Sequence, residues 1–108
     1  MLEESRFVRL ASGFIDRAAE AIEDAAADRA EVDLQGGILT VAIEGVGQYV
    51  LNRHGPMRQL WLSSPRSGAS HYDYDQASGR WRDSRGGPDL ASRWREELAA
   101  AGIAVALD

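Results

Sequence analysis

The chain has 108 residues, of which 44% are hydrophobic and 27% charged, values typical of one globular domain and unlike a disordered sequence. It contains no cysteine and no lysine, which excludes disulfides, thiolate metal sites, a thiol nucleophile and Schiff-base chemistry. The formal net charge is −5, and residues 1–35 carry all of it, because residues 36–108 hold eight acids and eight arginines.

The N-terminal segment MLEESRFVRL is acidic and amphipathic and lacks the apolar core of a secretory signal. No apolar run approaches the roughly 20 residues that span a bilayer. An acidic surface repels nucleic acid and anionic lipid and attracts cations or a basic protein surface. We therefore expect a cytoplasmic protein that binds neither nucleic acid nor membrane.

Apolar residues at helical spacing predict one long helix over residues 5–28. The residues that form this stripe are Phe7, Leu10, Ala11, Phe14, Ala18, Ala21, Ile22 and Ala25. The acids Asp16, Glu20, Glu23 and Asp24 lie on roughly the opposite side of the same helix.

After Gly36-Gly37 the hydrophobic period changes from 3.6 to 2, which predicts strands. They are expected at residues 38–44, 48–53, 58–63, 70–75 and 79–83, with residues 31–34 as a candidate edge strand. The connections are too short for crossover helices, so the sheet should be an antiparallel meander.

Pro88 is expected to open a second helix that ends at Gly102. Its inward-facing residues would be Leu90, Ala91, Trp94, Leu98 and Ala101. The tail, with Ile103, Val105 and Leu107, alternates and should pack as a strand or as an extended segment. Together these elements predict a single α+β domain over residues 1–108, a two-layer sandwich with two helices on one face of an antiparallel β-sheet.

Alternation assigns the two faces of the sheet. Leu60 and Leu62 point one way and Gln59 and Trp61 the other, and the leucines belong against the helices. The residues expected inside are Tyr49, Leu51, Tyr72, Tyr74 and Trp81, and those expected outside with Trp61 are Gln48, Asn52, His71, Asp73, Arg80 and Arg82. Trp61 would then stand on a flat polar face, where it either anchors a protein partner or packs against Asn52 or His71.

The two histidines lie on different segments. His54 is expected in a loop before Gly55-Pro56, as a surface residue, and neither histidine has the spacing of a metal triad. No Ser-His-Asp order, phosphate loop or Glu-x-x-His motif occurs, so we assign no catalytic residue.

Three segments resemble the frataxin family, which includes bacterial CyaY-type proteins and mitochondrial frataxins. They are GGILTV at residues 36–41, YVLNRHGPMRQLWLSSPRSGASHYDY at residues 49–74, and Gly79-Arg80-Trp81. The likeness covers nearly the whole chain, although Arg17 and Arg29 interrupt the acids and the segment at residues 85–88 is atypical. The resemblance implies the fold predicted above.

The resemblance also implies an iron-binding acidic ridge along the first helix and first strand. The positions that match this ridge are Asp16, Glu20, Glu23, Asp24, Asp28, Glu31 and Asp33. It further implies that the outer face of the sheet docks onto a cysteine desulfurase and its iron–sulfur scaffold protein. The matching residues on that face are Asn52, Gln59, Trp61 and His71.

Carboxylates are hard oxygen ligands that suit Fe²⁺ or Fe³⁺ when soft ligands are absent. Glu20, Glu23 and Asp24 lie within about one helical turn, so two or three of them could share a hydrated ion, weakly and with little selectivity against Mn²⁺, Co²⁺ or Ca²⁺. The alternative is a solvated helix face without metal.

The hypothesis is therefore an iron-binding accessory protein of iron–sulfur cluster assembly. It would act as iron donor, as regulator of the desulfurase–scaffold complex, or as both, and be a monomer in the absence of metal. Two alternatives stay open: a weak ferroxidase or iron-storage activity on the ridge, and a binding module with no metal role.

Overall fold

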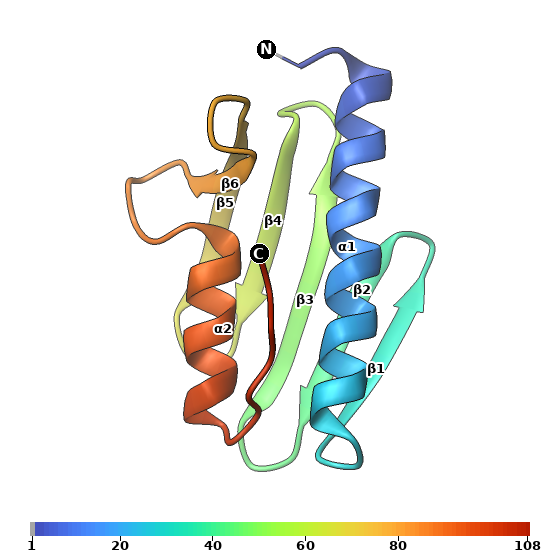
Figure 1. Cartoon of the computed structure of the whole chain (residues 1–108), viewed down its shortest axis with the longest axis vertical. Helices are drawn as coiled ribbons and strands as arrows, with labels where there is room; N and C mark the ends of the chain where they lie inside the picture. The colour runs from blue at the N-terminus through green and yellow to red at the C-terminus, as the bar shows by residue number, and fades with distance from the viewer. Residues whose placement is uncertain (1) are drawn as a thin grey trace.

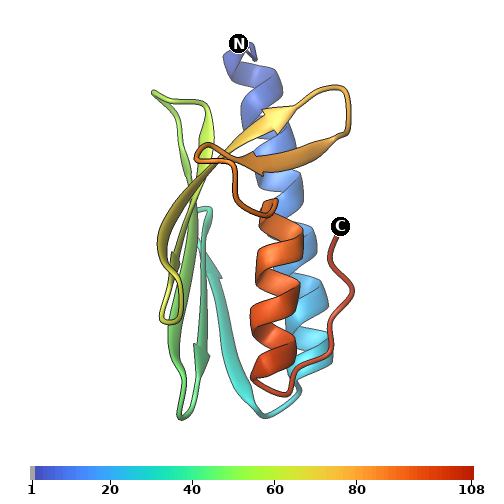
Figure 2. The same cartoon turned by 90° about the vertical axis from the view of Figure 1, so that its left-hand side faces the viewer.

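The computed structural model describes residues 2–108 and shows two layers, with two helices on one face of a six-stranded antiparallel sheet (Figures 1 and 2). A hydrophobic core fills the space between the layers. The predicted α+β sandwich is thus confirmed. Neither helix is both long and apolar enough to cross a membrane.

The helices and strands follow one another in an order that makes a simple meander. They are α1 (Glu4–Ala26), β1 (Ala30–Gln35), β2 (Ile38–Ile43), β3 (Gly47–His54), β4 (Gln59–Ser64), β5 (Gly68–Asp75), β6 (Arg80–Asp83) and α2 (Leu90–Ala100). Each strand pairs only with its neighbours in the sequence, and the candidate edge strand is present as β1. The five strands predicted after Gly36-Gly37, β2 to β6, lie within two residues of their predicted ends.

Helix α1 packs over β1, β2 and β3. Its apolar stripe is rotated slightly from the predicted one, because Ile15 and Ala26 are buried whereas Ala25 is exposed. The helix ends at Ala26, and the next residue, Ala27, turns the chain with a φ of 52° while its backbone N–H donates to Glu23 O. This turn places β1 directly beside the exposed flank of α1.

Helix α2 packs on β6 and begins two residues later than predicted. Pro88 does not open it. Instead Asp89 caps the helix by accepting a hydrogen bond from the backbone N–H of Ser92 at 3.2 Å. Gly102, with φ of 85°, ends the helix as expected.

The tail after Gly102 is extended and forms no strand. Ile103, Val105 and Leu107 are buried, and the segment runs back between the two helices (Figure 1). Arg95 Nη1 fixes its end by donating to Leu107 O at 2.7 Å.

A polar cluster ties α2 to the sheet. Glu97 Oε1 accepts from Tyr49 Oη at 3.0 Å and from Ser64 Oγ at 2.6 Å, and its other oxygen accepts from Ser67 Oγ at 2.7 Å. Burial, together with the hydrogen bond and negative charge of Glu97, raises the pKa of Tyr49 to about 12.

Candidate functional site: an acidic ridge and an open sheet face

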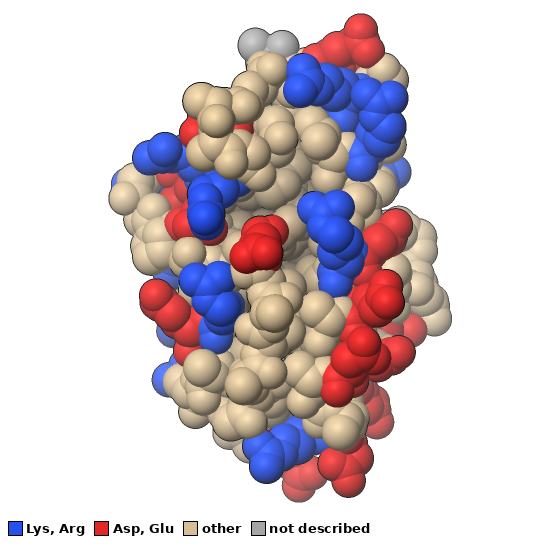
Figure 3. Space-filling model, viewed as in Figure 1, with Lys and Arg blue, Asp and Glu red and all other residues tan. Residues whose placement is uncertain are grey.

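All seven carboxylates of the predicted ridge are exposed. They come from α1, from the turn after it and from β1, and Figure 3 shows acidic side chains gathered along this edge of the molecule. On β1, Glu31 and Asp33 are exposed whereas Val32 between them is half-buried, as the alternation of a strand requires.

Helix α1 and strand β1 form a shallow hollow between them. Its volume is about 270 Å³, and its lining comprises Asp16, Ala19, Glu20, Glu23, Val32 and Leu34. Three carboxylates of the ridge thus surround one partly apolar depression, in which a hydrated cation would meet negative charge from α1.

The ridge carboxylates have no cationic partner within residues 2–108. The ion pairs found there are Arg80–Asp89, Arg82–Asp75 and Arg93–Asp83, all on the side of α2 and β6. The two arginines that interrupt the ridge in sequence do not neutralise it, since Arg29 Nη1 donates to Gly102 O at 2.6 Å and Arg17 folds back toward Gly13.

The described chain brings no three carboxylate or histidine side chains close enough to hold one ion together. An ion on the ridge would therefore meet at most two carboxylates in these positions and would keep water in its other coordination sites. Such a site is open and weak, and the ridge as a metal site stays a prediction.

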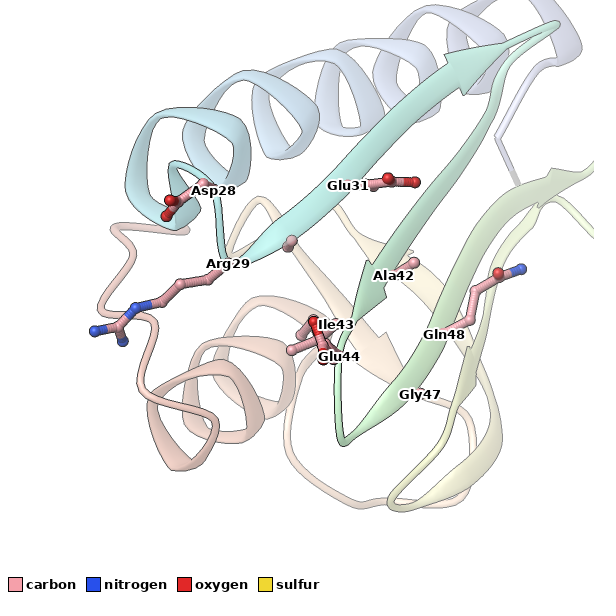
Figure 4. Close-up of a pocket in the computed structure, with 9 residues that line it drawn as sticks. Asp28, Arg29, Glu31, Ala42, Ile43, Glu44, Gly47 and Gln48 are labelled. Atoms are coloured by element: carbon pink, nitrogen blue, oxygen red, sulfur yellow. The ribbon is translucent and has the colours of Figure 1, made fainter.

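A wider hollow of about 490 Å³ lies where the turn between α1 and β1 meets the β2–β3 connection and the adjoining ends of these strands. Asp28, Glu31 and Glu44 line it with Arg29 and Gln48. Figure 4 shows that these three carboxylates extend in different directions and do not converge. The hollow is therefore wide and acidic without being a metal cage.

The second predicted surface lies on the sheet face that no helix covers (Figure 2). Strand register places Asn52, Trp61 and His71 in one row across β3, β4 and β5, and His54, Gln59 and Asp73 in the next row. The four residues predicted to bind a partner therefore do lie together. We call these six residues the outer-face patch.

Trp61 stands on the uncovered face of the sheet, as predicted, and is half-buried there. Its indole stacks on the His54 ring at a centroid distance of 3.9 Å and on the His71 ring at 4.1 Å, with interplanar angles of 6° and 13°. Its Nε1 donates to Gln59 Oε1 at 2.9 Å. Packing against His71, one of the alternatives left open by the sequence, is thus confirmed.

Gln59 was expected to be exposed, yet it is only 6% exposed. Alternation assigned its side chain to the correct face, but its neighbours cover it. Its Nε2 donates to Asp73 Oδ1 at 3.0 Å, and its Oε1 accepts from Trp61. Gln59 therefore orients Trp61 and Asp73 and has little contact with solvent.

The prediction for His54 was wrong. It is the last residue of β3 and not part of a loop, and its Nδ1 accepts from the backbone N–H of Met57 at 3.3 Å. The alternation of side chains along a strand could have placed His54 correctly, because it is two residues after Asn52 and therefore lies on the same face. Tyr74, expected inside, is half-buried and packs edge-on against Trp81 at 5.2 Å.

Comparison with known proteins agrees with this geometry. The chain matches the family model of the frataxin-like domain over residues 1–102. The iron–sulfur cluster assembly protein CyaY of Azotobacter vinelandii is 41% identical over 91 residues, which cover 82% of this chain and 79% of that protein. CyaY of Pseudomonas aeruginosa is 40% identical over 81 residues, or 75% of this chain and 73% of that protein.

The mitochondrial frataxin of Dictyostelium discoideum is 38% identical over 85 residues, which cover 79% of this chain. Those residues are 44% of that frataxin, so the chain spans about half the length of the mitochondrial relatives it matches.

Solved structures give the same result. Frataxin from Psychromonas ingrahamii superposes with a TM-score of 0.82 at 28% identity, covering 96% of both chains. Trimeric yeast frataxin complexed with ferrous iron gives a TM-score of 0.74 at 32% identity, covering 85% of this chain and 84% of that one. The chain belongs to the frataxin family.

Proposed function

We propose that this protein binds iron weakly on its acidic ridge and serves iron–sulfur cluster assembly as an accessory protein. The observation that carries the proposal is the row of exposed carboxylates on α1 and β1, which have no ion-pair partner in residues 2–108. Bacterial relatives named for cluster assembly, and a yeast relative complexed with ferrous iron, support the same role.

Iron is cargo in this proposal. Exposed carboxylates that keep water on the ion exchange it readily, which suits donation to another protein or sensing of iron. A di-iron oxidation centre needs several ligands that converge, commonly including Glu-x-x-His pairs. No three candidate ligands converge in the described chain, so the geometry favours donation or regulation over a ferroxidase.

The partner we propose is a cysteine desulfurase together with its scaffold protein. The ridge would attract a basic surface of this complex, and the outer-face patch would supply Trp61 as a rigid anchor. Aromatic anchors with fixed side chains dominate many protein interfaces. Asn52, Gln59 and His71 would surround this anchor.

The experiment is reconstitution of cluster assembly from the cognate desulfurase and scaffold, with and without this protein and Fe²⁺. The wild type should change the assembly rate, and the effect should fall several-fold in Trp61→Ala and in Glu20→Gln/Glu23→Gln/Asp24→Gln. Glu96→Gln, an exposed acid on α2, is the matched control and should act as the wild type does. If the wild type leaves the rate unchanged with or without iron, the proposed function is wrong.

A further inference from the structure

Three aromatic rings stack on the open face of the sheet, with the indole of Trp61 in the middle. Its ring centroid lies 3.9 Å from that of His54 and 4.1 Å from that of His71, with interplanar angles of 6° and 13°. The indole Nε1 donates to Gln59 Oε1 at 2.9 Å. Because both ring faces and the only polar atom of this side chain are occupied, the part left for a partner is the carbon edge of the indole.

Strand register explains why the two histidines lie on opposite sides of Trp61. His71 is directly opposite Trp61 on β5, whereas Asn52 is directly opposite it on β3. His54, two residues after Asn52, therefore reaches the indole diagonally, across the roughly 7–8 Å that separate diagonal neighbours in a sheet. All three rings are half-buried on the face opposite the hydrophobic core. The stack is thus ordered without being part of that core.

The turn between β3 and β4 fixes the ring of His54 in the free chain. The Nδ1 atom of His54 accepts from the backbone N–H of Met57 at 3.3 Å. Arg58 closes the turn, because its backbone N–H donates to Gly55 O at 3.1 Å and its Nη1 donates to the same oxygen. An imidazole that accepts at Nδ1 carries its proton on Nε2. The backbone thus orients this ring before any partner binds.

We infer that His54 and His71 are positioning residues for docking, which hold Trp61 with its edge toward the partner. The inference rests on the proposed docking of the outer-face patch and adds to it the shape of the partner's site. A flat surface that stacks on the indole would have to displace one histidine and lose the contacts of that ring. A narrow apolar slot receives the free edge and leaves the stack intact, so the proposed partner carries such a slot.

Substitution can separate the two contacts of His54. His54→Phe keeps a flat ring against the indole and removes the acceptor for the N–H of Met57. His54→Asn does the reverse, since its amide oxygen can accept from Met57 but it has no ring. If stacking positions Trp61, His54→Phe should keep the indole in place and His54→Asn should release it.

The free chain is tested first, by nuclear magnetic resonance. The sequence has two histidines, so their ring protons are readily assigned. In the wild type the ring current of the indole should displace these resonances, and Trp61→Ala should return them to their ordinary positions. His54→Asn should accelerate the exchange of the Trp61 Nε1 proton with water, whereas His54→Phe should not. Equal exchange rates in His54→Asn and the wild type would overturn the inference, because His54 would then not order the indole.

Docking is measured as affinity for the cognate desulfurase–scaffold complex. His54→Asn should raise the Kd about fivefold, because the partner must then immobilise a free indole. His54→Phe should recover that loss, and Ser63→Ala, at an exposed position on the same face of β4, is the control that should change the Kd little. In a chain that already carries Trp61→Ala, His54→Asn should have no further effect, since His54 acts through Trp61.

The complex itself tests whether Trp61 meets the partner edge-on. With histidine labelled only in this chain, the ring protons of His54 and His71 should keep their displaced resonances when the partner binds. Return of either to its ordinary position would show that a face of the indole is uncovered, and would overturn the slot.

Two further results would overturn the positioning role: His54→Phe binding as weakly as His54→Asn, or a further loss from His54→Asn in the Trp61→Ala chain. A Trp61→Ala variant that binds as the wild type does would instead contradict the proposed docking surface. The resonances of the free chain would still show, in that case, whether His54 orders the indole.

Discussion

Trp61 is held more firmly than a surface tryptophan normally is. Imidazole rings of His54 and His71 cover both faces of its indole, and Gln59 accepts from its Nε1. Cross-strand aromatic pairs of this kind stabilise a sheet modestly and fix the rotamers involved. The side chain proposed to anchor a partner is therefore ordered before binding, and it loses little conformational entropy when it docks.

Substitutions at neighbouring positions of β4 should separate folding from docking. Leu62 is 1% exposed, so Leu62→Ala should cost about 2–5 kcal/mol of unfolding free energy. Trp61→Ala removes the ring contacts with His54 and His71 and the hydrogen bond to Gln59, and should cost about 1–2 kcal/mol. Urea denaturation measures both, and equal losses would show that Trp61 is part of the core.

Tyr49 should reveal the buried link to α2 through its ionisation. Its pKa is raised to about 12, above the ordinary value of about 10, so the folded state retains the proton longer than the unfolded state does. The stabilisation is complete below pH 10 and is lost as the pH rises from 10 through about 12.

Ultraviolet absorbance of the phenolate measures this titration, and the difference between wild type and Tyr49→Phe isolates Tyr49. Glu97→Gln removes the adjacent negative charge and should move the transition to lower pH. A Tyr49 transition near pH 10 in the folded wild type would contradict the geometry of the cluster.

At the level of helices and strands, the 3.6-residue and two-residue hydrophobic periods of the sequence predicted most of the elements that the structure shows. The alternation of side chains along β4 assigned Leu60, Trp61 and Leu62 to the correct faces of the sheet. It could not predict that Gln59 is buried or that His54 stacks on Trp61, because those outcomes depend on cross-strand register and on the rotamers of neighbouring side chains. The start of α2 was predicted too early for a local reason. Asp89, and not Pro88, marks the boundary, because the Asp89 carboxylate accepts a hydrogen bond from the backbone N–H of Ser92 and caps the helix.

The sequence predicted which residues form the ridge but not their arrangement. Helical spacing placed Glu20, Glu23 and Asp24 together on α1, yet spacing alone cannot give the direction of flexible carboxylates. The polar cluster around Glu97 was also missed, because it joins residues 49, 64 and 97, which are remote in sequence.

Removing ridge charge should stabilise α1. Glu23 and Asp24 lie next to the negative end of the helix dipole, and Glu20 repels both at distances of three and four residues. Glu20→Gln/Glu23→Gln/Asp24→Gln should therefore raise the unfolding free energy by about 1 kcal/mol in low salt, as measured by urea denaturation. Glu96→Gln serves as control and should change it little. A destabilised triple variant would mean that the carboxylates stabilise the fold, which their exposure and lack of ion pairs argue against.

At the scale of the whole molecule, the ridge and the outer-face patch lie on different sides of a thin body. The ridge follows the α1–β1 edge and the patch covers the open side of the sheet (Figures 2 and 3). The shortest extent is 21 Å, so one large partner complex can contact both surfaces at once. Iron held on the ridge would then reach that complex without any movement within this chain.

Anaerobic titration with Fe²⁺, followed by the amide resonances, tests most directly whether the ridge binds iron. Paramagnetic broadening should affect residues 16–33 first and leave residues 48–63 sharp, and the Glu20→Gln/Glu23→Gln/Asp24→Gln variant should need much more iron for the same effect. If His54 or His71 broadens first, or if the triple variant titrates as the wild type does, iron binds elsewhere and the account of the ridge is wrong.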